Sequence, residues 1–189
     1  IDSGIQLTKT AIAPVVEDNV LLGTLYGIAI PGAQDSIVRR NRIEGRQDRH
    51  MNARGNGVYV WNAPGAVVAD NDIQFGRAGI FVNSSKKNLF TGNLFRDLRF
   101  AVHYMYADNS EVSNNVSIGN DLGYAVMFTS NVKVTDNVSI DDREHGVMLN
   151  YANKSVITGN VVKGATEKCT FLYNSNKNEF TNNWFQGCG

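Results

Sequence analysis

Several residue types that mark other classes of protein are scarce or balanced in this chain of 189 residues. It has only three prolines, and its two cysteines are too few for a disulfide-stabilised scaffold. The 18 basic residues balance 18 acidic ones, so no excess charge would recruit nucleic acid or anionic lipid. No apolar run approaches the roughly 20 residues that a transmembrane helix needs. We therefore expect neither a nucleic-acid-binding protein nor a membrane-spanning one.

The abundant residues indicate a folded domain with many turns. Hydrophobic residues make up 42% of the chain, and its length fits one domain. The 23 asparagines and 18 glycines are typical of tight turns and unfavourable inside helices.

One type of asparagine recurs at a nearly constant spacing. It is usually preceded by Asn, Asp or Gly and followed by an apolar residue, and successive copies are 22, 30, 22, 22, 22, 23 and 23 residues apart. The copies are Asn19, Asn41, Asn71, Asn93, Asn115, Asn137, Asn160 and Asn183. An ordinary globular domain has no reason to show such a repeat.

A short strand precedes most of these asparagines. It begins at a small residue 14 positions upstream, as in Gly57–Val60 and Ala101–Tyr104. In Ala125–Phe128 the offset is 12, so we expect a turn shortened by two residues. The repeat has no helical period, and leucine-rich repeats and propeller blades need other units. It predicts an all-β fold, a right-handed parallel β-helix of about eight coils of 22–23 residues.

Equivalent residues of successive coils should stack about 4.8 Å apart. The repeated asparagines would then form a structural ladder at a corner of the coil, where amides bond to neighbouring turns. Two apolar ladders would fill the interior. The first comprises Ile28, Val58, Ile80, Val102, Val126 and Val147, and the second Ile30, Val60, Val82, Tyr104, Phe128 and Leu149.

The spacing of 30 between Asn41 and Asn71 indicates an insertion, which we place at residues 45–54. Insertions in solenoids often form the binding face, so His50 and Met51 are candidates for a secondary metal or docking loop. We expect residues 1–189 to form a single β-helix domain. Neither end shows a polar cap, so further coils or a partner should cover the ends. We expect the chain to be a fragment of a longer β-helix.

The residue between the two inward positions of each strand should face outward. In coil order these residues are Ala29, Tyr59, Phe81, His103, Met127, Met148 and Phe171. This column is aromatic at both ends and carries histidine and methionine at its centre, whereas an ordinary surface column is polar. Met105 and His145 lie close to it in the sequence.

Thioether and imidazole ligands together favour Cu(I), whereas zinc usually recruits cysteine or carboxylate. We therefore predict a transient Cu(I) site formed by His103, Met127 and Met148, with Met105 and His145 as further candidates. The alternative is an exposed apolar interface for a protein partner, in which the histidines only form hydrogen bonds.

The cysteines offer a weaker case for a thiol ligand. The stacking registers of Cys169 and Cys188 differ by about four residues, which disfavours a disulfide between them.

An enzymatic alternative rests on the charged residues Asp141, Asp142 and Arg143. Parallel β-helices often carry polysaccharide lyases and epimerases, which need a base, an acid and a cation for the uronate. Acids beside arginines at a solvated corner are more typical of ion pairs. We therefore expect no catalytic residues and no enzyme.

Four segments of the chain resemble the NosD family. They are Gly57–Asn62, Arg96–Tyr106, Leu122–Phe128 and His145–Asn153. The likeness covers nearly the whole chain, and its most specific stretches are His-Tyr-Met-Tyr and His-Gly-Val-Met-Leu-Asn-Tyr.

NosD proteins are periplasmic β-helix proteins needed to assemble the copper sites of nitrous-oxide reductase. The resemblance implies a non-enzymatic maturation factor that works with ABC-type ATPase and membrane subunits, a copper-chaperone lipoprotein and the reductase. It also implies that this chain is shorter than its relatives. The predicted copper ligands come from the stacking argument. A metal-free scaffold, which would bind its partners regardless of copper, is the third interpretation.

Overall fold

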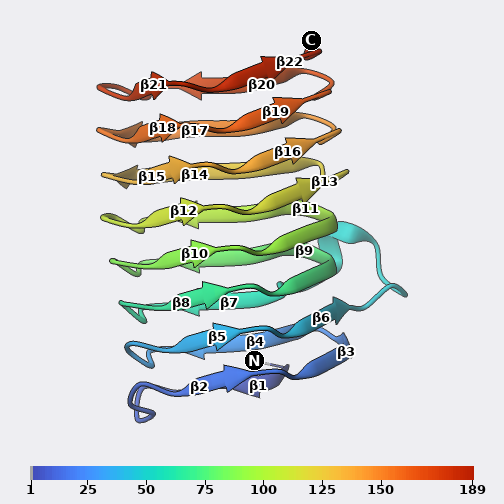
Figure 1. The fold of residues 1–189 in the computed structure, drawn as a ribbon. Helices are drawn as coiled ribbons and strands as arrows, with labels where there is room; N and C mark the ends of the chain where they lie inside the picture. Colours follow the sequence, from blue (N-terminus) through green and yellow to red (C-terminus); the bar gives the residue numbers. More distant parts are fainter. Residues whose placement is uncertain (1) are drawn as a thin grey trace.

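The chain winds into a parallel β-solenoid with one short strand of an eight-stranded sheet in each turn (Figure 1). The computed structural model describes residues 2–189, so Ile1, the first residue of the predicted domain, lies outside it. The strands nearest the viewer in Figure 1 run from left to right, and the chain returns behind them as it rises towards the C-terminus. This sense is right-handed. Among the described residues there is no α-helix, so the predicted all-β fold is confirmed.

Two sheets form the faces of the solenoid. The eight-stranded sheet contains β2 (Val15–Glu17), β5 (Ile37–Arg39), β8 (Val67–Ala69), β10 (Leu89–Thr91), β12 (Glu111–Ser113), β15 (Lys133–Thr135), β18 (Val156–Thr158) and β21 (Glu179–Thr181). The fourteen-stranded sheet contains β1 (Ser3–Gln6), β3 (Val20–Thr24), β4 (Tyr26–Pro31), β6 (Arg42–Gly45), β7 (Val58–Trp61), β9 (Asp72–Asn83), β11 (Leu94–Met105), β13 (Val116–Ile118), β14 (Leu122–Ser130), β16 (Val138–Ile140), β17 (His145–Asn153), β19 (Val161–Lys163), β20 (Lys168–Tyr173) and β22 (Trp184–Gln186).

A ladder of asparagine side chains runs the length of the solenoid. Asn71 is typical: its side-chain Nδ2 donates to Asn93 Oδ1 (2.9 Å) and to the carbonyl of Val38 (3.1 Å). Its backbone N–H also donates to Asn93 Oδ1, at 3.0 Å. The same pattern joins Asn19, Asn41, Asn71, Asn93, Asn115, Asn137, Asn160 and Asn183. Each amide therefore satisfies buried backbone groups that the turn leaves without partners.

The interior is filled by apolar side chains that stack from coil to coil, but one coil differs from the predicted alignment. Register places Tyr124 opposite Val102 and Val126 opposite Tyr104. Tyr124 is therefore the inward residue, buried with its hydroxyl donating to the Val138 carbonyl at 2.9 Å. Phe128, which we expected in the core, is 36% exposed. The small residue that begins this strand is Gly123, 14 positions before Asn137 as in the other coils, so no turn is shortened.

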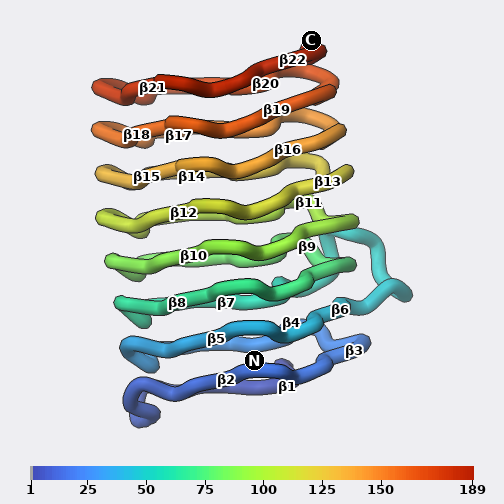
Figure 2. Tube along the Cα trace, viewed as in Figure 1, coloured from blue at the N-terminus to red at the C-terminus, as the bar shows by residue number. Residues whose placement is uncertain are grey.

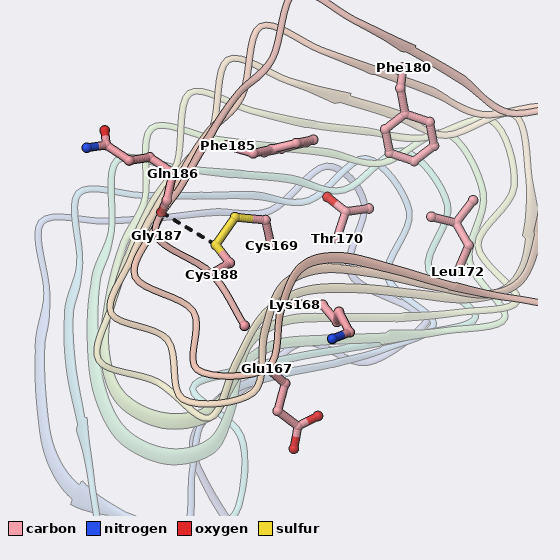
Figure 3. Close-up of a pocket in the computed structure, with 11 residues that line it drawn as sticks. Glu167, Lys168, Cys169, Thr170, Leu172, Phe180, Phe185, Gln186, Gly187 and Cys188 are labelled. Carbon is pink, nitrogen blue, oxygen red and sulfur yellow. Dashed lines mark hydrogen bonds between the residues drawn. A yellow bond between two sulfur atoms is a disulfide. The ribbon is translucent and has the colours of Figure 1, made fainter.

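A disulfide joins Cys169 to Cys188, contrary to the prediction from stacking register (Figure 3). Cys169 stacks on Gly146, in the column of small residues that begin the strands. This column lies on the inner side of a corner of the coil. A Cβ built on Gly146 would lie 2.3 Å from a methyl of Val162. Val162 is on β19, the strand that precedes the turn at this corner. Cys188 lies across the same corner, with its Cα 5.3 Å from that of Cys169. The corner therefore pairs residues that do not stack.

The 3-10 helix η1 (Met51–Ala53) lies between β6 and β7, in a loop that projects from the right of the coil in Figure 2. It lies against β9 and β11. The loop is also joined to β11 by a bond from Arg99 Nη1 to Asn52 Oδ1 (3.3 Å). In the part of the chain that the structure describes, no helix has the length and hydrophobicity to cross a membrane.

Candidate functional site

Two columns of outward residues on the fourteen-stranded sheet carry most of the predicted ligands. In the first, Phe81, His103, Ala125, Met148 and Phe171 stack in that order. In the second, the order is Asn83, Met105, Met127, Asn150 and Tyr173. Met127 thus stacks on Met105 and not on His103, which corrects the single column expected from the sequence.

The structure nevertheless brings His103 and Met127 into contact. His103 Nε2 lies 3.4 Å from Met127 Sδ, across the boundary between the two columns. Two aromatic rings hold the imidazole in place, because Phe100 stacks on it with centroids 4.4 Å apart and Phe81 lies 4.9 Å away. These contacts restrict rotation of the imidazole, so the His103 nitrogen is held next to the Met127 sulfur.

The surroundings keep His103 neutral. Burial, and then the positive charges of Arg77 and Arg99, lower the pKa of His103 to about 4. At neutral pH its ring therefore carries a free lone pair, which metal coordination requires.

Met105 and His103 line a cavity of about 380 Å³ beside this pair. Tyr26, Tyr59 and Phe81 form its aromatic wall. The remaining lining residues are Asn56, Arg77 and Ala78. The cavity gives a ligand direct access to the imidazole and to one further thioether.

His145 and Met148 lie farther along the coil axis than His103. Strand register places His145 in the column of Phe100 and Met148 in the column of His103. The rings of Phe100 and His103 are in contact. His145 Nε2 lies 3.6 Å from Glu167, and Nδ1 is buried without a hydrogen-bond partner among the described residues. Ala125 separates Met148 from His103 within their column.

A small apolar cluster outside the solenoid interior contains Met127 and Met148. Its buried members are Ala78, Phe100, Leu122 and Ala125, and its partly buried members are Phe81, Met127 and Met148. The cluster leaves the thioethers only partly exposed, so water competes less for any ion that they bind.

The insertion does not add its histidine and methionine to this arrangement. His50 is exposed and precedes η1, where its Nδ1 accepts a hydrogen bond from the backbone N–H of Asn52 at 3.4 Å. Neither His50 nor Met51 lines the cavity beside His103.

The charged residues of the enzymatic alternative are dispersed. Asp142 is fully buried, where its carboxylate accepts hydrogen bonds from Ser117, Ser139 and the backbone of Asn120. Burial raises the pKa of Asp142 to about 6, against the effect of these bonds. Arg143, by contrast, forms an exposed ion pair with Asp121. A polysaccharide at the surface therefore has no access to the Asp142 carboxylate.

Sequence reasoning missed two features of this face. One is the pair of Arg77 and Arg99, which lie side by side because Gly76 pairs with Leu98 and Ala78 with Phe100. Their spacing of 22 residues was the available signal. The other is an exposed stack of Tyr106, Phe128 and Tyr151, with ring centroids 5.4 and 5.2 Å apart. These aromatics also recur at the coil period.

The donor set is soft. Within residues 2–189, no group of three or more His, Cys, Asp or Glu side chains is arranged to hold a metal ion. The available donors are imidazole nitrogen and thioether sulfur, which suit Cu(I) and offer little to Zn²⁺ or to cations that require oxygen.

Comparison with known proteins identifies sequence relatives over most of the chain. A family model described as "Periplasmic copper-binding protein (NosD)" matches residues 41–189. The chain is 32% identical to a "Probable ABC transporter binding protein NosD" from Stutzerimonas stutzeri, over 98% of this chain and 46% of the relative. A protein of the same description from Pseudomonas aeruginosa is also 32% identical, with the same coverage. The chain spans about half the length of the curated relatives it matches.

Solved structures with low sequence identity share the fold. The periplasmic alginate epimerase AlgG superposes with a TM-score of 0.75 at 16% identity, over 96% of this chain and 47% of that one. The Dettilon tailspike protein gives 0.73 at 15% identity, over 96% and 43%. The Streptococcus pneumoniae adhesin PfbA gives 0.73 at 12%, over 98% and 61%. An epimerase, a tailspike and an adhesin on one fold indicate architecture alone.

Proposed function

Because this chain belongs to the NosD family, described as periplasmic copper-binding proteins, we propose that it accepts Cu(I) on the outer face of its β-helix. We infer that it does so transiently, during assembly of the copper sites of nitrous-oxide reductase. The observation that carries the proposal is the contact of 3.4 Å between His103 Nε2 and Met127 Sδ. A neutral imidazole and a thioether side by side are ligands that a cuprous ion prefers.

The proposed site has two stations. The first is His103 with Met127 and Met105, and the second is Met148 with His145. His145 supports the second station because its buried Nδ1 has no hydrogen-bond partner among the described residues. A cuprous ion accepts low coordination numbers, so flexible methionines can hand it from one station to the next along the coil axis. His50 and Met51 would act only as a secondary metal or docking loop, separate from the ion bound at His103 and not required for it.

The proposed partners follow from the family and from the names of the relatives. Both relatives are called probable ABC transporter binding proteins, which supports docking to ABC-type ATPase and membrane subunits. A copper-chaperone lipoprotein would deliver the ion, and nitrous-oxide reductase would receive it. A periplasmic location agrees with the Cys169–Cys188 disulfide, since such bonds persist in oxidising compartments. We also propose that residues 1–189 are one domain of a longer β-helix, as the length of the relatives suggests.

The structure favours this proposal over a lyase or epimerase. The relatives are named as binding proteins, and the buried Asp142 is unavailable to a polysaccharide. A metal-free scaffold would use the same apolar face for docking and would bind its partners equally well without copper.

An anaerobic Cu(I) competition titration tests the proposal. The protein should bind one cuprous ion, and the variant His103→Ala/Met127→Ala/Met148→Ala should lose that binding while its circular dichroism is retained. The variant His50→Ala/Met51→Ala removes the same donor types from the insertion and serves as the matched control. Equal binding by the protein and the triple variant would refute the site, and no binding by either would favour the scaffold.

A further inference from the structure

The outer face beside His103 carries two positive charges without a counter-charge. Arg77 and Arg99 lie next to each other on β9 and β11, at the strand spacing of about 4.8 Å. Neither forms an ion pair with a carboxylate anywhere in residues 2–189. The next residue along this column is Asp121, which is already paired with Arg143.

The cavity beside these arginines is lined by hydrogen-bond donors. Arg77 and Asn56 both line it. Asn56 accepts the backbone N–H of Ala78 on its side-chain oxygen at 3.2 Å, so its Nδ2 group is the part that can donate to a ligand. Tyr26 and Tyr59 also line the cavity and carry hydroxyls, and burial raises the pKa of Tyr59, so its hydroxyl stays protonated. No carboxylate lines the cavity.

A bare cuprous ion fits this environment poorly. The donors His103, Met105 and Met127 are all neutral, so they cancel none of the charge of a bound cation. Like charges repel, and water screens this repulsion only in part because Arg99 is half-buried. A cuprous ion alone would therefore add a third positive charge beside two arginines.

We propose that copper reaches this site as a Cu(I)–thiolate. Arg77 and the Asn56 amide bind the thiolate in the cavity, Arg99 adds its positive charge from the neighbouring strand, and His103 and Met127 bind the metal. This inference rests on the proposed copper function. A soft anion is required because it must share Cu(I) with soft donors, and thiolate is the soft anionic ligand that cysteine and small thiols supply.

The exchange balances in charge and atoms. A bis-thiolate complex of Cu(I) carries one negative charge and is attracted to the arginine pair. It loses one thiolate, which leaves as a free anion, and gains His103 Nε2 and Met127 Sδ. The second thiolate remains bound to copper, and copper stays in the +1 state throughout. The retained thiolate comes either from a small thiol or from a cysteine side chain of a protein.

Selenium identifies the retained ligand directly. The protein is incubated anaerobically with Cu(I) and benzeneselenolate, separated by gel filtration, and analysed for selenium and copper, with copper-edge X-ray absorption to detect a Cu–Se bond. The variant Arg77→Gln/Arg99→Gln removes the two charges. The variant Arg39→Gln/Arg40→Gln removes two neighbouring arginines that pair with Glu17 and Asp18, and is the control. A second arm replaces benzeneselenolate with a neutral peptide that carries one selenocysteine.

We expect about one selenium per copper in the protein and in the control variant, and less than a tenth of that in Arg77→Gln/Arg99→Gln. Without any thiolate or selenolate, this variant should bind Cu(I) at least as tightly as the protein does, because a repulsion has been removed. Retention of benzeneselenolate would identify a small thiol as the source of the retained thiolate. Retention of the peptide alone would identify a protein cysteine as that source.

Two results would overturn the inference and leave the copper proposal standing. They are copper bound without selenium, and equal selenium retention in the protein and in Arg77→Gln/Arg99→Gln. If the protein bound no copper with or without selenolate, the proposed function and this inference would both be wrong.

Discussion

His103 and Met127 lie on adjacent strands and in different columns of the outer face, yet Nε2 of one is 3.4 Å from Sδ of the other. The contact depends on the aromatic rings of Phe81 and Phe100, which hold the imidazole towards the methionine. It is the basis of the first prediction.

Replacing Met127 with leucine should weaken Cu(I) binding at least tenfold with little loss of stability. Leucine fills a similar volume, so the cost to folding should be below about 1.5 kcal/mol, but it provides no sulfur. Competition titration gives the affinity, and urea unfolding gives the stability. Met51→Leu is the matched control in the insertion. An unchanged affinity in Met127→Leu would remove Met127 from the site.

Truncating one member of the asparagine ladder should destabilise the fold severely. Asn115→Ala leaves the carbonyl of Phe90 and the backbone N–H of Asn93 buried without their present partners. Each such group costs about 1–3 kcal/mol, so we expect a loss of roughly 3 kcal/mol in the free energy of unfolding. The exposed Asn52→Ala should change it by less than about 0.5 kcal/mol. Similar losses for both variants in urea unfolding would contradict the role of the ladder.

Asp142 should make the protein less stable as the pH rises through 6. Its pKa is raised from 3.8 to about 6 in the folded state, so the native protein binds this proton more tightly than the unfolded chain does. The resulting stabilisation is complete below pH 3.8 and is lost as the pH rises through 6. Asp142→Asn should therefore be the more stable protein at pH 7.5, by an amount on the order of 2 kcal/mol.

Urea unfolding from pH 4.5 to 7.5 measures this effect as the difference between the protein and Asp142→Asn. Asp136→Asn is the control, because Asp136 is exposed and asparagine tolerates its positive φ of 55°. A difference between the protein and Asp142→Asn that did not vary with pH would show that Asp142 titrates normally.

Removing the disulfide should lower stability and leave copper binding intact. The bond closes a loop with a sequence separation of 19 residues, for which the chain-entropy model gives about 3 kcal/mol. Cys169→Ala/Cys188→Ala should therefore melt at a lower temperature, and the unmodified protein should contain no titratable thiol. Cu(I) affinity should be unchanged, since the disulfide is remote from His103 in the coil order. A loss of copper binding in the folded variant would assign the cysteines a role in the site.

The one error in the alignment shows the limit of a periodic pattern. Placing Ala125 where Gly123 lies is a slip of two residues, and such a slip keeps every side chain on its own face of the strand. Alternation therefore could not reveal the slip, although Tyr124, and not Phe128, fills the core of this coil. The disulfide was missed for a related reason, because stacking predicts neighbours along the axis and says nothing of residues that meet across a corner.

The sequence by itself determined the solenoid, the length of its coils and the residue types on its outer face. A repeat of 22 or 23 residues permits this because each coil buries its apolar residues and asparagine against identical positions of the next. Only the tertiary structure decided which outward side chains touch. Contact between His103 and Met127 crosses two columns and depends on the packing of Phe81 and Phe100 around the imidazole. That packing is three-dimensional, and no spacing along the chain encodes it.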